Sequence, residues 1–200
     1  MSLKPDLPQV SMATRADWRQ WLTEHHATSA GVWAVTVKKG ALAAGEAYVS
    51  AQDLNEECLC FGWIDSKPGR VDERRTALLC TPRKAGSGWS KVNKDRLERL
   101  SAEGRLHPAG RAAIAAAKAD GSWSKLDEVD LLAVPDDLTA ALAAVSVARA
   151  NFDAFPPSAR RGILEWIAQA RSDATRAKRV AETARLAGEN VRANQWRPKG

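Results

Sequence analysis

The sequence predicts an α+β protein: a small antiparallel sheet of about three strands packed with helices, followed by a helical C-terminal part. Short runs rich in Val, Leu and Thr alternate in polarity between residues 32 and 83, which is typical of strands. From Ser90 onward apolar residues recur three and four apart between cap residues, which is typical of helices. With 200 residues, 44% of them hydrophobic, the chain can bury an ordinary core.

The first predicted element is a helix in "TRADWRQWLTEHHATS". Trp18, Trp21, Leu22 and His25 follow one another at the spacing of a single apolar stripe. Thr14 stands just before this stripe and is the expected N-cap.

Three strands are expected next. "GVWAVTVKK" predicts a strand over residues 32–38, and "GWID" and "RTALLCTPR" predict two more. In the polar "SKPGRVDER" that joins the last two, Pro68-Gly69 signals a turn. Between the first strand and these two, "SAQDLNEECLCFG" predicts a helix capped by Ser50.

Five further helices are expected. "SKVNKDRLERLSAEG" begins at Ser90 and stops at Gly104, and "HPAGRAAIAAAKADG" begins behind His107 and stops at Gly121. "PDDLTAALAAVSVAR", "PPSARRGILEWIAQAR" and "SDATRAKRVAETARLAG" predict the other three, the last capped by Ser172 or Asp173. The tail is expected to be loose, with Trp196 a candidate for folding back.

We divide the chain into an α+β domain over residues 1–126 and a helical region over residues 127–200. The second is expected to pack on the first, because Ile163, Trp166, Ile167 and Val180 are apolar positions that need cover.

The net charge of +6 resides in the C-terminal segment. Residues 156–200 hold 10 basic and 4 acidic side chains, whereas residues 1–155 are balanced. A nucleic-acid-binding role would use basic residues of this segment as phosphate contacts. Several of these charges alternate with Glu at helical spacing, which favours a solvated helix face. The candidate contacts are Arg171, Arg176, Lys178, Arg179 and Arg185.

Common catalytic signatures are missing from the sequence. It holds no Gly-x-Gly-x-x-Gly, Walker A, His-Glu-x-x-His or Gly-x-Ser-x-Gly pattern, and its three histidines suit neither a metal nor a triad. The spacing of Cys58, Cys60 and Cys80 favours reduced, buried thiols. We therefore expect no cofactor, no metal and no catalytic residue. The N-terminus shows no apolar run behind a basic start and no stretch reaches membrane-spanning length, so a cytoplasmic protein is expected.

The candidate ligand site is the stretch from Phe61 to Arg96. Strand alternation puts Trp63 and Asp65 on one face, and Asp65 is expected to pair with Arg83. The Gly-rich loop and the following helix N-terminus offer backbone N–H groups, so the stretch predicts binding of a small anionic or carboxylate-bearing ligand. The same residues also suit an ordinary structural hairpin. The predicted site residues are Trp63, Asp65, Arg83, Lys84, Ser87, Trp89, Ser90 and Asn93.

The motifs "FGWIDS", "TPR", "SGWSKVNKDRLERL", "GRLHPAG", "PDDLTAAL", "FPPSARRGILEWI" and "TRAKRV" resemble the YdeI/OmpD-associated, or bacteriocin-protection, family. The resemblance runs from Trp18 to about Leu186, and Cys80 and Leu106 depart from residues common in that family. It implies protection against bacteriocins and cationic antimicrobial peptides and supplies no catalytic residue. Some members are described as periplasmic or porin-associated.

These observations favour a non-enzymatic cytoplasmic ligand-binding or stress-protection protein of this family type. A nucleic-acid-binding protein is one alternative. An enzyme is the other, and it would need Asp65, Asp72 or Glu73 as a general base with Arg83 stabilising charge.

Overall fold

The computed structural model describes residues 6–195, which fall into two compact units. The first contains the chain up to Ser87 and Val92–Asp120. The second contains Gly88–Lys91 and the chain from Gly121 onward. The boundary expected from the sequence lies at residues 126–127.

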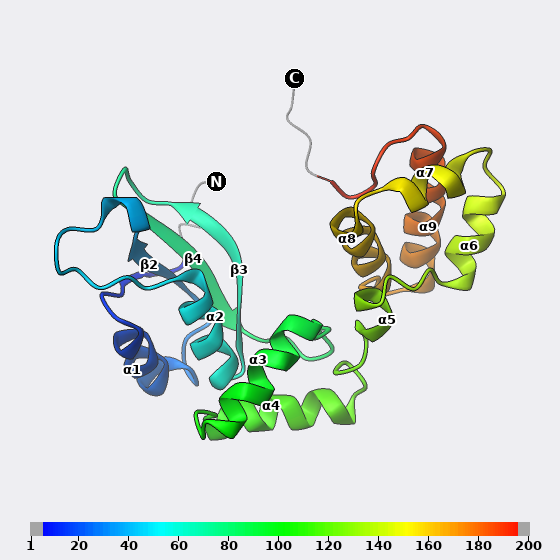
Figure 1. Cartoon of the computed structure of the whole chain (residues 1–200). Helices are drawn as coiled ribbons and strands as arrows, with labels where there is room; N and C mark the ends of the chain where they lie inside the picture. Colours follow the sequence, from blue (N-terminus) through cyan, green and yellow to red (C-terminus); the bar gives the residue numbers. More distant parts are fainter. Residues whose placement is uncertain (1–5, 196–200) are drawn as a thin grey trace. The chain divides into compact units, whose positions relative to one another are not determined.

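The first unit is built on a four-stranded sheet (Figure 1). Its order is β1-β2-β4-β3, with β1 parallel to β2 and the other neighbours antiparallel. The α+β class is confirmed, but the sheet is mixed and has one strand more than expected, because a three-residue strand is too short to show alternation. The strands are β1 (Gln9–Ser11), β2 (Val32–Val37), β3 (Trp63–Arg70) and β4 (Arg75–Pro82).

Three helices of this unit begin at the predicted caps. Thr14 and Ser50 each form a capping box with the Asp three residues later, and the His107 side chain accepts a hydrogen bond from the N–H of Ala109. The helical elements of the unit are α1 (Arg15–His25), the 3₁₀ turn η1 (Lys39–Ala41), α2 (Ala51–Cys60), α3 (Lys91–Ala102) and α4 (Pro108–Ala119).

The predicted turn at Pro68-Gly69 is wrong. Strand β3 continues through both residues to Arg70, and the chain reverses over residues 71–74. A β-bulge between Asp65 and Pro68 accommodates the proline, whose missing N–H is tolerated because β3 is an edge strand.

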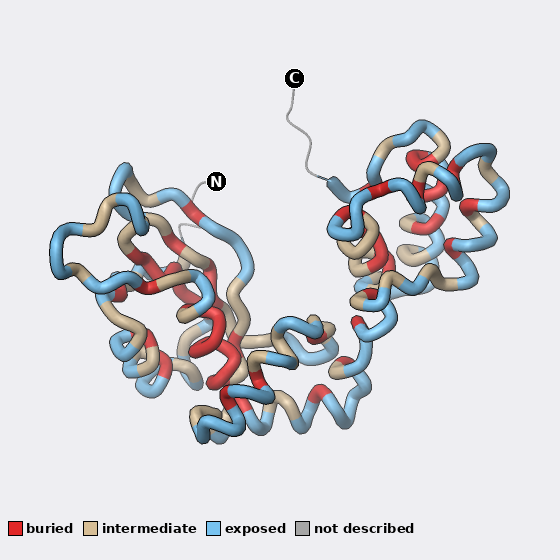
Figure 2. The backbone as a smooth tube through the Cα atoms, viewed as in Figure 1, coloured by how far each residue is buried: buried red, intermediate tan, exposed pale blue. Residues whose placement is uncertain are grey.

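The sheet has two different faces. On one, Trp63 and Cys80 pack against Trp18 of α1, Leu54 of α2 and Leu100 of α3, all at most 2% exposed. The other carries a smaller cluster made of Trp33, Val35, Ala77 and Leu79, with Leu7 and Val71 packed against it. Strand β2 contributes to both clusters, so nearly all of its residues are buried (Figure 2).

Helix α4 approaches the end of α2 very closely. A Cβ on Gly110 would lie 2.1 Å from the carbonyl oxygen of Cys60. Only glycine permits this contact between a helix and the last turn of another.

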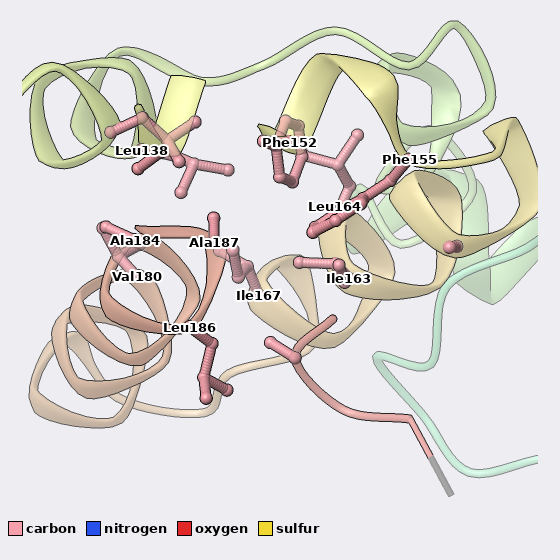
Figure 3. Packing of buried hydrophobic residues seen from close by; sticks show 14 of the residues in the cluster. Leu138, Phe152, Phe155, Ile163, Leu164, Ile167, Val180, Ala184, Leu186 and Ala187 are labelled. Carbon is pink, nitrogen blue, oxygen red and sulfur yellow. The ribbon is translucent and has the colours of Figure 1, made fainter. Parts of the chain in front are cut away.

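The second unit is entirely helical in its described part and has its own core (Figure 3). The sequence predicted one helix over "PDDLTAALAAVSVAR", but two form, because Val147 adopts a left-handed conformation with φ 56° in a segment of β-branched residues and Ser. The helices are α5 (Asp127–Asp130), α6 (Asp136–Ala143), α7 (Ala148–Ala154), α8 (Pro157–Ala168) and α9 (Asp173–Gly188), with Ser172 as the α9 N-cap.

The apolar positions of the last 45 residues are covered within this unit. Ile163, Ile167 and Val180 belong to its buried cluster, and Trp166 packs against that cluster. Trp196, the candidate for folding back, lies outside the described residues.

The stability of the first unit should fall in mild acid because of His107. Burial, followed by the positive charges of His26, Arg19 and Arg111, lowers the pKa of His107 below its ordinary value. Below pH 6.5 the unfolded chain therefore binds a proton that the folded chain does not, and the free energy of unfolding drops as the pH falls. Asn can also cap a helix but does not titrate. In His107→Asn the free energy of unfolding, measured by urea denaturation, should therefore lose this part of its pH dependence. Parallel pH profiles for the two proteins would contradict the prediction.

Gly110→Ala should destabilise the first unit by about 2 kcal/mol, because the new methyl group would overlap the Cys60 carbonyl. Gly40→Ala is the matched control, since a Cβ there meets nothing within 4 Å. Urea denaturation of both variants measures the difference. Equal stabilities would show that α4 can move away from α2 at little cost.

Candidate functional site

Trp63 is part of the core of the first unit. It is 1% exposed, its indole N–H donates to the carbonyl of His26 at 3.2 Å, and its ring meets Trp21 edge-on at 5.8 Å between centroids. A ligand cannot reach this ring without displacing core side chains.

The expected pair between Asp65 and Arg83 is wrong. The register puts Asp65 opposite Cys80 and Trp63 opposite Pro82, so the alternation of β4 directs Arg83 to the other face of the sheet. The carboxylate of Asp65 instead accepts a hydrogen bond from the amide of Asn55 in α2, at 2.6 Å.

Asn55 joins two of the predicted residues. Its amide nitrogen lies 2.6 Å from Asp65 and 3.5 Å from the amide oxygen of Asn93, and its own oxygen accepts from Arg96 at 2.6 Å. Because Asn55 is only 5% exposed, the group is a polar tie between α2, β3 and α3.

Arg83 and Lys84 border a pocket of about 670 Å³ on the opposite face of the sheet from Asp65. Arg83 continues the strand pairing, since its N–H donates to the carbonyl of Gly62 at 3.0 Å. Burial lowers the pKa of Arg83 to about 10, which leaves the guanidinium charged at neutral pH. The lining includes Asp6, Leu7, Lys67, Leu79, Arg83 and Lys84.

The remaining predicted residues lie elsewhere. Ser87 closes a local turn by donating to the carbonyl of Lys84 at 2.6 Å. Trp89 and Ser90 belong to the second unit, where Trp89 is 1% exposed and packs against Trp123 at 5.2 Å between centroids. The eight predicted residues therefore do not form one site.

The most strongly buried charges of the first unit were not predicted. Glu56 and Glu57 in α2 are 2% and 0% exposed, and Figure 2 shows this helix as a buried segment. Glu57 accepts from Arg15 at 2.6 Å and from Arg19 at 2.7 Å, and it also pairs with Arg105.

Glu56 has its own arginine partners. Arg15 lies 2.9 Å away, Arg99 also pairs with it, and Gln52 donates at 2.9 Å. Burial acts to raise the pKa of Glu56, but the hydrogen bonds from Gln52 and Arg15 and the charges of Arg15 and Arg99 outweigh it, so this pKa lies below its ordinary value. The network connects α1, α2 and α3.

A sequence signal for this network existed in "NEEC". Three consecutive polar residues cover about 200° of a helix, so in a helix flanked by Leu54 and Cys58 some of them face the interior. Their arginine partners lie about forty residues away in the sequence, and spacing alone does not identify them.

The carboxylates proposed for the enzyme alternative have structural roles. Asp72 accepts hydrogen bonds from the backbone N–H groups of Arg74 and Arg75 at the β3–β4 turn. The hydrogen bond from the Arg75 side chain, followed by the one from its backbone N–H, lowers the pKa of Asp72. Glu73 pairs with Arg70 on the surface. A carboxylate with a lowered pKa is a poor general base near neutral pH.

Three of the five basic residues proposed for nucleic-acid contacts are bound within the second unit. Arg176 makes two hydrogen bonds with Asp137, at 2.7 and 2.9 Å. Arg179 stacks over the Trp166 ring at 5.0 Å, and Arg185 pairs with Glu189. This leaves fewer guanidinium groups for phosphate contacts.

All three cysteines are free and buried, as the sequence predicts. Burial is the main cause that raises the pKa of Cys58 well above its ordinary value, so the thiol is protonated and unreactive. Among residues 6–195 no group of three or more His, Cys, Asp or Glu is arranged to hold a metal ion. None of the helices described is both long and apolar enough to span a membrane.

Two family models match the chain. Residues 10–113 match the Domain of unknown function (DUF8412), and residues 132–190 match the family described as Bacteriocin-protection, YdeI or OmpD-Associated. The second match is the family that the sequence motifs resemble, over a shorter stretch than the resemblance spans. No curated protein and no solved structure matches the chain.

The buried network should contribute strongly to stability. Glu57→Gln leaves three arginines facing a neutral amide and should lower the free energy of unfolding by about 3 kcal/mol. In the control Glu103→Gln, an exposed partner of Arg99 is changed, and the loss should stay below about 1 kcal/mol. Urea denaturation of both variants tests this, and equal losses would show that the buried pairs contribute no more than surface ones.

Proposed function

Because the chain belongs to the family defined by the DUF8412 domain, and its residues 132–190 form a bacteriocin-protection, YdeI- or OmpD-associated domain, we propose that it is a non-enzymatic ligand-binding protein in stress protection. Its ligand is a small molecule that carries a carboxylate or another anionic group. The binding residues are Arg83 and Lys84, at the end of β4.

The pocket beside Arg83 is the observation that carries this proposal. Its volume of about 670 Å³ lies within the usual range of small-molecule sites. Among the described residues of its lining, Lys67, Arg83 and Lys84 contribute three positive charges against the one carboxylate of Asp6. A guanidinium can also hold a carboxylate with two parallel hydrogen bonds.

The lining supports binding rather than catalysis. The described residues around the pocket include no histidine or cysteine, the side chains that most often exchange protons or attack substrates at neutral pH. The carboxylates of the enzyme alternative are engaged elsewhere, Asp65 with Asn55 and Asp72 with Arg75.

The stress-protection role can be tested in cells. A strain that lacks the protein should be killed by lower doses of a bacteriocin or a cationic antimicrobial peptide, and the wild-type gene should restore survival. We also propose the cytoplasmic location that the sequence predicts, and fractionation of the same cells tests it. Unchanged survival of the deletion strain, or recovery of the protein outside the cytoplasm, would contradict these two parts of the proposal.

Arg83→Ala should abolish ligand binding without lowering the melting temperature. Burying a guanidinium costs free energy, as its lowered pKa indicates, and the truncation removes this cost together with the anion contact. Mass spectrometry should detect a small molecule that copurifies with the wild type from its native cells and is lost from the variant.

Lys39→Ala is the matched control, because it removes an exposed positive charge of the same unit outside the pocket. If Arg83→Ala strongly lowers the melting temperature and does not change the copurifying molecules, then Arg83 stabilises the fold and does not bind the ligand. Nucleic acid as the copurifying species, released steeply by added salt, would favour the alternative function.

A further inference from the structure

The pocket of the first unit has an apolar end and a cationic end. Leu79 and Thr81 of β4 and Arg83, which continues the strand pairing directly after it, stand at every second position, so their side chains lie on one face of the sheet. All three line the pocket. Along this direction the lining therefore changes from the hydrocarbon of Leu79, through the hydroxyl and methyl groups of Thr81, to the guanidinium of Arg83.

The apolar end belongs to a buried cluster. Leu79 is 5% exposed and packs with Trp33, Val35 and Ala77, and Leu7 packs against this group. Leu7 also lines the pocket. A hydrocarbon body placed there would extend an existing apolar surface and would be removed from water.

The charges at the cationic end come from β3 and from the residues directly after β4. Lys67 comes from the bulged part of β3, and Arg83 and Lys84 follow β4 directly. Asp6 is the single carboxylate among the lining residues that the structure describes, so the charge at this end favours an anion.

The spacing along the strand sets the length of a suitable ligand. Four residues of an extended strand span roughly 13 Å, the distance from the Leu79 position to the Arg83 position. A chain of about eight carbon atoms fits this span, whereas a bare carboxylate reaches only one end.

Building on the function proposed above, we propose that the pocket binds amphiphilic anions, which have a hydrocarbon body of about eight carbons and a carboxylate head. The body lies against Leu7 and Leu79, and the head contacts Arg83 and Lys84. The apolar end selects for length and the cationic end selects for charge.

Three probes separate the two ends in calorimetric titrations of the full chain. Octanoate has both body and head, 1-octanol has the same body without the charge, and acetate has the head alone. Octanoate should bind at least tenfold more tightly than either of the others.

Two variants assign the head contact. Arg83→Gln should weaken octanoate binding at least tenfold and leave octanol binding unchanged, and Lys84→Gln, an exposed substitution that leaves the core untouched, should weaken it in the same direction. Lys39→Gln, which removes the same charge outside the pocket, should stay within twofold of the wild type. Equal effects of the Lys39 and Lys84 substitutions would overturn the assignment.

The probes also distinguish failure of this inference from failure of the proposed function. If acetate binds as tightly as octanoate, the pocket is an anion site and the apolar end plays no part, so this inference is wrong. If octanol binds as tightly as octanoate, the head contact is wrong. If neither octanoate, acetate nor inorganic phosphate binds, the proposed anion-binding function itself fails.

Discussion

The pairing of two buried carboxylates with arginines is the interaction on which the first unit depends. Glu56 and Glu57 are carried into the interior by α2, because Leu54 and Cys58 of the same helix pack on the sheet. A buried carboxylate is costly unless it is paired and hydrogen-bonded. The arginine partners of Glu56 and Glu57 come from elements before and after α2 in the sequence. They are Arg15 and Arg19 in α1, Arg99 in α3, and Arg105, which follows α3.

The helices that carry this network cover one face of the sheet, and the pocket proposed for the ligand lies on the other. Helices α1, α2 and α3 cover the first face, where Trp18 and Trp63 are buried. Among the described residues the opposite face carries the smaller cluster, and the residues at the end of β4 border the pocket. Arg83 is a partly buried charge that borders this pocket, whereas Asp65 is hydrogen-bonded to Asn55 within the fold.

The second unit depends on a different principle, the burial of an apolar helical core. Phe152, Ile163 and Ile167 are at most 1% exposed within a cluster that needs no buried carboxylate (Figure 3). Its arginines lie at the edge of this core. Arg179 covers the Trp166 ring, and Arg176 of α9 forms two hydrogen bonds with Asp137 in the first turn of α6. These basic residues thus contribute to packing within the second unit.

The sequence by itself determined the fold class, the capped helices at Thr14, Ser50 and Ser172, and the resemblance to the family matched by the second unit, because periodicity, caps and motifs are local properties. Tertiary structure decided which residues meet. Asp65 lies opposite Cys80, and Arg83 comes three residues after Cys80, so the alternation of strand side chains puts the two on different faces. The register that decides this comes from pairing across the sheet. The partners of Glu56 and Glu57 were likewise settled by the packing of α1 and α3 around α2, because a buried charge is satisfied by whatever cation the fold brings within reach.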